Sequence, residues 1–194
     1  MLRVAFVCTG NRARSPLAAA LLRRHLGGAP LAVSSYGTLD VEGMPALPDA
    51  IAVAAALGVD LSAHRARALR RGLLVDDDLV IGFEPSHAAA AVEVGQARTE
   101  RVFLLLELPE LLDRLAVPSG SGARHARQVI AELGRLRDAR PRGSAILADP
   151  IGESRQVFAE VARVIDAVTH ALAAALAPLP AERLRPVVTR QPEG

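Results

Sequence analysis

One cysteine, one arginine and one serine stand close together near the amino terminus, with a spacing that suits phosphoryl transfer. Cys8 is the only cysteine of the chain, Arg14 follows six positions later, and Ser15 comes next. A thiolate is a strong nucleophile, and a guanidinium can hold two phosphate oxygens while it stabilises the charge of the transition state. A neighbouring hydroxyl would donate to the thiolate and help it leave. These residue types predict a phosphatase that attacks phosphorus with Cys8.

The residues around these three lie where a strand should meet a helix. Leu2 to Val7 is a short apolar run typical of a buried strand, and Pro16 suits the start of a helix that ends at Gly27-Gly28. A helix start presents unpaired N–H groups and partial positive charge, which bind a phosphate dianion and favour thiolate over thiol. Gly10 and Asn11 tolerate the left-handed backbone angles that a tight loop needs. We therefore expect the phosphate-binding residues in this loop: Thr9, Gly10, Asn11, Arg12, Ala13 and Ser15.

The order of strand and then helix recurs along the chain. Further strands are predicted over residues 31–36, 79–81 and 102–106, and further helices over 48–57, after Pro85 and over 154–176. This alternation predicts an α/β fold with one four-stranded parallel sheet and helices on both faces. In such sheets ligands bind beyond the carboxyl ends of the strands, which is where the Cys8 loop lies.

Two segments interrupt this order. Residues 118–143 are rich in Ser, Gly and Arg, and we interpret them as an insertion with a helix over 124–137. Residues 178–194 contain four prolines without apolar periodicity, and they predict a flexible tail. The remainder is expected to form a single domain over residues 1–177.

Composition and charge exclude several classes of function. The net charge is only +2 and the arginines are spread along the chain, so no nucleic-acid partner is expected. A lone cysteine and an amino terminus without an export signal predict a cytoplasmic protein, and no apolar run reaches the roughly twenty residues that would cross a membrane. No histidine pair has metal-ligand spacing, so we expect neither a metal nor a cofactor. The chain carries no signal for an oligomeric state.

The sequence from Val7 to Pro16, VCTGNRARSP, resembles the signature loop of the low-molecular-weight protein tyrosine phosphatase family. Ser35, the run Gly58 to Arg67 with its His64, and the pair Asp149-Pro150 also resemble segments of that family. The likeness covers most of residues 1–115 and 145–177. It implies a flavodoxin-like fold and activity on a phosphorylated protein or a small phosphoester.

The resemblance also implies a role for individual residues. Cys8 would form a cysteinyl-phosphate, Arg14 would bind the phosphate, and Asp149 would protonate the leaving oxygen and then activate water. The reaction itself also requires such an acid, because an alkoxide or phenoxide leaves slowly without a proton. Ser35 and His64, together with Asn11 and Ser15, would hold the loop in shape by hydrogen bonds.

Three positions depart from the usual pattern of the family. Ala13 stands where many relatives have a second cysteine, so reversible protection of Cys8 by an internal disulfide is not expected. Ile151-Gly152 stands where tyrosine-directed relatives carry aromatic residues, while Thr9 and the segment Asp149 to Gly152 resemble the protein-arginine phosphatase branch. Phosphotyrosine and phosphoarginine therefore both stay open as substrates. Two other hypotheses are an arsenate reductase coupled to an external thiol and a phosphate-binding module without catalysis.

Overall fold

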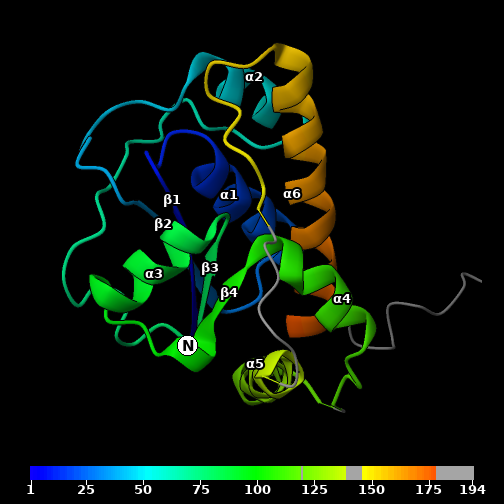
Figure 1. Cartoon of the computed structure of the whole chain (residues 1–194). Helices are drawn as coiled ribbons and strands as arrows, with labels where there is room; N and C mark the ends of the chain where they lie inside the picture. Colours follow the sequence, from blue (N-terminus) through cyan, green and yellow to red (C-terminus); the bar gives the residue numbers. More distant parts are fainter. Residues whose placement is uncertain (119, 139–145, 178–194) are drawn as a thin grey trace, which may run out of the picture.

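The sheet has the composition and topology that the sequence predicts. A computed structural model describes residues 1–118, 120–138 and 146–177. Four parallel strands lie in the order β2-β1-β3-β4. Their bounds are β1 (Leu2–Cys8), β2 (Leu31–Gly37), β3 (Leu79–Gly82) and β4 (Val102–Leu104). The predicted single-domain α/β fold with a four-stranded parallel sheet is confirmed (Figure 1).

Strand β1 shows why both faces of the sheet are covered. Its side chains alternate between the faces, and all except that of Arg3 are buried. Val4 and Phe6 belong to the core under α1 (Arg14–Leu26) and α6 (Arg155–Leu176), whereas Ala5 and Val7 belong to the core under α3 (Pro85–Glu93). Figure 1 shows the two long helices and α3 on opposite sides of the strands. An apolar strand that is covered on both faces is typical of a parallel sheet.

The remaining helices complete the core on the side of α6. They are α2 (Pro48–Ala56), α4 (Leu108–Asp113) and α5 (Gly122–Asp138), with short 3-10 turns at Thr99–Arg101 and Leu105–Glu107. The predicted helix over 124–137 falls within α5, and its apolar face joins the main core through Ala126, Val129, Ile130 and Leu133. The interpretation of 118–143 as an insertion stays a prediction. Residues 119 and 139–143, and the predicted tail over 178–194, lie outside the described residues.

The start of the first helix and the end of the fourth strand differ from the prediction by two residues each, for local physical reasons. The first helix begins at Arg14 rather than at Pro16, because the carbonyl of Ala13 already accepts from the amide of Leu17 at 3.2 Å. Pro16 is therefore the third helical residue, where its missing N–H breaks no intrahelical bond. The fourth strand ends at Leu104 rather than at residue 106, because a 3-10 turn follows it directly. In the described ranges no helix is long and apolar enough to cross a membrane.

Candidate active site

The loop from Thr9 to Ala13 joins the carboxyl end of β1 to the start of α1. Asn11 takes a left-handed φ of 50°, as the sequence predicts, but Gly10 does not adopt a positive φ. A side chain at Gly10 would meet only Arg12 Cγ at 4.0 Å, so neither strain nor crowding requires a glycine there. The tight turn of the loop is therefore made at Asn11.

Gly37, at the end of β2, lets the loop pack against the sheet. A Cβ atom at Gly37 would lie 2.9 Å from the main-chain atoms Thr9 O, Gly10 C and Asn11 N. Backbone atoms cannot swing aside as a flexible side chain can, so the position tolerates only glycine without a shift of the loop. The amide of Thr38 also donates to the carbonyl of Cys8 at 2.9 Å. The sequence analysis missed Gly37.

Cys8 is nearly buried, with 3% of its surface exposed, and its sulfur is surrounded by donors. The amide of Asn11 donates to Cys8 Sγ at 3.3 Å, and Ser15 Oγ lies 2.9 Å from the same sulfur. The side chain of Asn11 donates to Ser15 Oγ at 2.8 Å. That oxygen acts as acceptor for Asn11, and its own proton can go either to the sulfur or to the carbonyl of Tyr36 at 3.3 Å. The sulfur of Cys8 therefore contacts one backbone amide and one hydroxyl.

Asn11 is in turn held from a loop that follows α2. Its side-chain oxygen accepts from the amide of Arg67 at 2.8 Å, and its carbonyl accepts from Nε2 of His64 at 2.7 Å. A carbonyl can only accept, so His64 carries its proton on Nε2. Burial and the nearby arginines 67, 23 and 65 lower the pKa of His64, although the bond to Asn11 opposes the shift. His64 thus contacts the loop in the way the resemblance implies.

The other predicted residues of the loop have different surroundings. The guanidinium of Arg12 donates to the carbonyl of Pro45 at 2.8 Å, so its charge is directed to the segment before α2. Ala13 is the N-cap of α1. Ser35 is buried, and its carbonyl accepts from the guanidinium of Arg67 at 3.1 Å. Its hydroxyl makes no hydrogen bond to the loop within the described ranges, so the network that supports Asn11 passes through His64 and Arg67.

Arg14 is buried, with 1% exposed, and its two terminal nitrogens have separate partners. NH1 donates to the carboxylate of Glu84 at 2.5 Å and to the carbonyl of Leu147 at 2.9 Å. NH2 donates to the carboxylate of Asp149 at 2.5 Å and to the hydroxyl of Thr9 at 3.3 Å. The predicted catalytic trio of Cys8, Arg14 and Asp149 is therefore gathered at one edge of the sheet.

Asp149 reaches this edge because its segment runs past the end of β3. The amide of Leu147 donates to the carbonyl of Phe83 at 2.9 Å, directly after that strand. One carboxylate oxygen of Asp149 binds Arg14, and the other accepts from the amide of Ile151 at 3.2 Å. About 30% of the Asp149 side chain is exposed, so the carboxyl group is accessible to substrate and water.

His87, in the first turn of α3, is a second neighbour of the loop. Its Nε2 lies 3.0 Å from the hydroxyl of Thr9, and its Nδ1 is buried with no partner in the described structure. An unpaired buried N–H is rarer than an unpaired acceptor, which places the proton on Nε2. Burial, and then the charge of Arg14, lower the pKa of His87 to about 4. His87 is therefore a neutral donor to Thr9.

The loop with its buried cysteine and the order of the strands can be compared with those of known families. A family model described as low molecular weight phosphotyrosine protein phosphatase matches residues 3–133. The chain belongs to that family. Across the described ranges of this phosphatase, no cluster of three or more His, Cys, Asp or Glu side chains could hold a metal ion.

Relatives of this phosphatase agree with the assignment. This chain is 38% identical over 104 residues to a probable low molecular weight protein-tyrosine-phosphatase, EpsP, of Ralstonia nicotianae. The aligned region covers 54% of this chain and 70% of EpsP. A solved low molecular weight protein tyrosine phosphatase from T. tengcongensis has 26% identity and a TM-score of 0.64, covering 89% of this chain and 97% of that one. The YwlE arginine phosphatase from Geobacillus stearothermophilus has 24% identity and a TM-score of 0.66, covering 91% and 93%. The last of these shows the shared fold alone.

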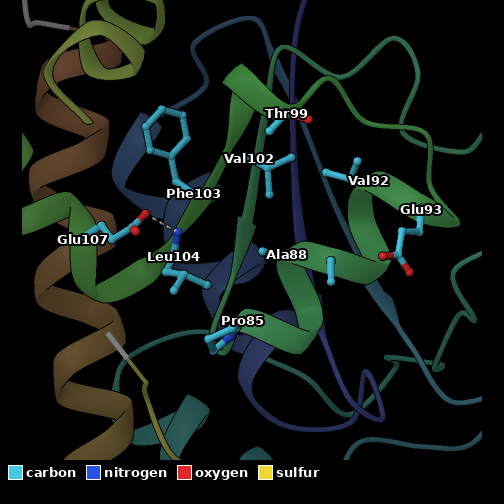
Figure 2. Close-up of a pocket in the computed structure, with 10 residues that line it drawn as sticks. Pro85, Ala88, Val92, Glu93, Thr99, Val102, Phe103, Leu104 and Glu107 are labelled. Carbon is cyan, nitrogen blue, oxygen red and sulfur yellow. Dashed lines mark hydrogen bonds between the residues drawn. The ribbon is translucent and has the colours of Figure 1, made fainter. Parts of the chain in front are cut away.

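A separate groove of about 520 Å³ lies between α3 and β4 of the phosphatase (Figure 2). Its lining is mainly apolar, with Val92, Val102 and Leu104 among its walls. Its Glu107 is engaged with the amide of Leu104 at 2.9 Å, as the dashed line in Figure 2 shows. No cysteine or arginine lines this groove, so it does not offer the groups that suit phosphoryl transfer.

The sequence analysis missed two residues of the site, Glu84 and His87. Both follow β3 within five positions of its last residue, Gly82. Polar residues directly after a parallel strand lie at the edge where ligands bind, and this rule was the available signal.

Proposed function

We propose that this member of the family hydrolyses phosphotyrosine in proteins through a cysteinyl-phosphate on Cys8. The observation that carries the proposal is that a sulfur in contact with an amide and a hydroxyl lies at the same edge of the sheet as a buried arginine that also contacts Asp149. A structural cysteine would need neither the arginine nor the acid. The roles below follow from these contacts.

The first step transfers the phosphoryl group to sulfur. The thiolate of Cys8 attacks phosphorus, the bond from phosphorus to the ester oxygen breaks, and Asp149 gives its proton to that oxygen. The products are a cysteinyl-phosphate, a free tyrosine hydroxyl and the carboxylate of Asp149. During this step NH2 of Arg14 exchanges Asp149 for a phosphoryl oxygen, stabilises the charge of that oxygen and keeps its contact with the hydroxyl of Thr9.

The second step releases phosphate. The carboxylate of Asp149 takes a proton from water, the water oxygen attacks phosphorus, and the bond between phosphorus and sulfur breaks. Cys8 leaves as a thiolate, and Ser15 Oγ, 2.9 Å away, donates to it as the charge develops. Asp149 is protonated again, and inorganic phosphate departs.

Thr9 supplies a further donor in this scheme. Its hydroxyl oxygen accepts from Arg14 at 3.3 Å and from Nε2 of His87 at 3.0 Å. With both acceptor sites used, the Thr9 proton is directed to a third partner, and a phosphoryl oxygen beside Arg14 fits that place. Thr9 therefore serves the phosphate group rather than the group that leaves.

The choice of phosphotyrosine rests on the relatives and on the rim of the loop. The Ralstonia relative with 38% identity is named a protein-tyrosine-phosphatase. Large exposed apolar side chains belong to segments that contact the loop or Asp149: Leu39, Met44 and Ile151. Such side chains suit a phenyl ring better than a charged guanidinium. Because Thr9 contacts Arg14 and His87, it gives no contact that would favour phosphoarginine.

The first test separates an enzyme from a binding module. The protein should hydrolyse para-nitrophenyl phosphate without added metal, and Cys8→Ser should lose this activity while it still binds phosphate. A short quench of the wild-type reaction should yield protein whose mass is increased by one phosphoryl group at Cys8. Undiminished turnover by Cys8→Ser would refute the mechanism, and tight phosphate binding without turnover would favour the binding module.

The second test concerns the acid. Asp149→Asn should slow hydrolysis of phenyl phosphate about a hundredfold more than that of para-nitrophenyl phosphate, since a good leaving group needs little protonation. Equal slowing of both esters would remove Asp149 from this role.

The third test fixes the substrate. Phosphotyrosine peptides should be turned over faster than matched phosphoarginine peptides, and the reverse order would assign the enzyme to the arginine branch. Consumption of arsenate that depends on an external thiol, without phosphatase activity, would support the reductase instead.

A further inference from the structure

Three arginines line one open pocket of about 450 Å³ on the flank of α1. Arg23 comes from α1, while Arg65 and Arg67 come from the loop that also holds Asn11. The hydroxyl-bearing residues Ser34 and Ser35 of β2 form another wall, and His64 completes the lining on the side of the catalytic loop. The pocket is polar and distinct from the site around Cys8.

The guanidinium groups in this pocket bind backbone carbonyls. Arg23 donates to the carbonyl of Val33 at 2.6 Å, and Arg67 donates to that of Ser35 at 3.1 Å. Arg65 donates to the carbonyls of Ser62 and His64, at 3.3 and 2.8 Å. Within the part of the chain that the structure describes, none of the three arginines pairs with a carboxylate. Their hydrogen-bond partners are neutral carbonyls, and the guanidinium of Arg67 also lies over the ring of Tyr36, 4.7 Å from its centroid.

The carboxylate of Asp60 also lines the pocket, but it is engaged elsewhere. It accepts from the amide of Ser62 at 2.7 Å and from the hydroxyl of Ser62 at 2.9 Å, and these bonds lower the pKa of Asp60. Other arginines of the chain do pair with carboxylates, as these ion pairs show: Arg14 with Glu84, Arg70 with Asp40, Arg127 with Asp78 and Arg155 with Asp49. Among the described residues, Arg23, Arg65 and Arg67 have no such partner, and the pocket brings these three together.

The excess of positive charge acts on the groups around it. Burial and the charge of Arg67 lower the pKa of Arg23. The same three arginines contribute to the lowered pKa of His64. An anion in the pocket would lie among these mutually repelling cations. It would therefore oppose the lowering of both pKa values by the arginines.

We propose that this pocket is a second phosphate-binding site, separate from the catalytic loop, which takes a phosphate dianion either free or as a monoester. Guanidinium groups bind phosphate with charge-assisted hydrogen bonds, and the hydroxyl of Ser35 can add a neutral one. The volume of the pocket leaves room for the group that an ester would carry. The site does not depend on catalysis by Cys8, so it can be tested independently of the proposed function.

A titration with inorganic phosphate, followed by amide chemical shifts in nuclear magnetic resonance spectra, tests the proposal. Two groups of amides should shift with different apparent affinities: residues 9–15 of the catalytic loop, and residues 33–35 with 60–67 around the pocket. Arg23→Gln should weaken binding at the second group about two- to fivefold, as expected for loss of one partly exposed ion pair. Arg65→Gln should weaken it by a similar factor.

The matched control is Arg24→Gln. Arg24 is the next residue of α1 and donates to the carbonyl of Leu57, outside the pocket, so this substitution should leave both affinities unchanged. Arg14→Ala should abolish binding at the catalytic loop and leave the second group of shifts in place. If the second group disappears in Arg14→Ala, or is unaffected by Arg23→Gln and Arg65→Gln, the proposal is overturned.

A second arm identifies the source of the phosphate. It uses a phosphoserine peptide and the Cys8→Ser variant, which cannot turn the peptide over in the proposed mechanism. Tighter binding of the peptide than of inorganic phosphate at the pocket amides supports a site for phosphorylated protein. Weaker binding supports a site for free phosphate. If neither probe shifts the pocket amides, the site does not exist.

Discussion

Replacement of His87 by asparagine should change how the stability of the protein depends on pH. The imidazole is 2% exposed, and burial with the neighbouring charge of Arg14 lowers its pKa from 6.5 to about 4. Between these two values the unfolded chain binds a proton at His87 that the native protein does not bind. Wild-type stability therefore falls as the pH falls through this range, whereas the asparagine variant lacks this contribution.

The magnitude follows from the two pKa values. Between pH 7 and pH 5 the proton bound by the unfolded chain should reduce the free energy of unfolding of the wild type by about 2 kcal/mol more than that of His87→Asn. Below a pH of about 4 both states bind the proton, and the loss levels off at about 3 kcal/mol. The variant also loses the ring and its bond to Thr9, but that loss does not depend on this titration.

Urea unfolding at several pH values measures the difference directly. The gap in unfolding free energy between wild type and His87→Asn should be widest near pH 7 and narrow toward pH 5. His170→Asn, at an exposed position of α6, controls for removal of an imidazole in general. If the wild-type and His87→Asn curves run parallel from pH 7 to pH 5, His87 is not held neutral by its surroundings, and its description as a neutral donor to Thr9 is refuted.

Two further predictions concern the scaffold of the site. Glu84→Gln should reduce kcat/KM for para-nitrophenyl phosphate about tenfold, because NH1 of Arg14 loses a charged acceptor, whereas Glu93→Gln at the end of α3 should leave it unchanged. If steady-state kinetics give the same kcat/KM for both variants, Glu84 is only a surface charge. Gly37→Ala should destabilise the protein by about 1 to 3 kcal/mol in urea unfolding, since its Cβ would lie 2.9 Å from backbone atoms. The control Gly10→Ala should lower the free energy of unfolding far less. Equal losses in the two variants would contradict the steric argument.

The sequence was sufficient for the sheet and for the centre of the site because those features depend on local signals. Apolar runs separated by helical periodicity predicted all four strands in parallel order, and the structure confirms them. The spacing of Cys8, Arg14 and Ser15 predicted one loop at a helix start, and the contacts of Asn11 with sulfur and hydroxyl follow from that loop. Chain proximity alone brings these groups together.

The remaining features depend on contacts between distant segments, which one sequence does not display. Glu84 meets Arg14 across 70 positions, and His87 meets Thr9 across 78, only because β3 lies beside β1. Gly37 is required because the Cys8 loop passes over the end of β2, which its own neighbours in sequence do not reveal. The helix predicted over 124–137 was recognisable, but its packing into the main core through Val129 and Leu133 was not.

The two carboxylates on Arg14 suggest how the proposed site prepares its acid. A buried guanidinium needs a partner in every state, and Glu84 on NH1 can supply one throughout the reaction. Asp149 on NH2 can then be an exchangeable partner, displaced when a phosphate dianion arrives. Once displaced, the carboxyl group of Asp149 is free to turn to the ester oxygen, which must receive a proton in the first step. Substrate binding would thus release from Arg14 the group that assists departure of the leaving group.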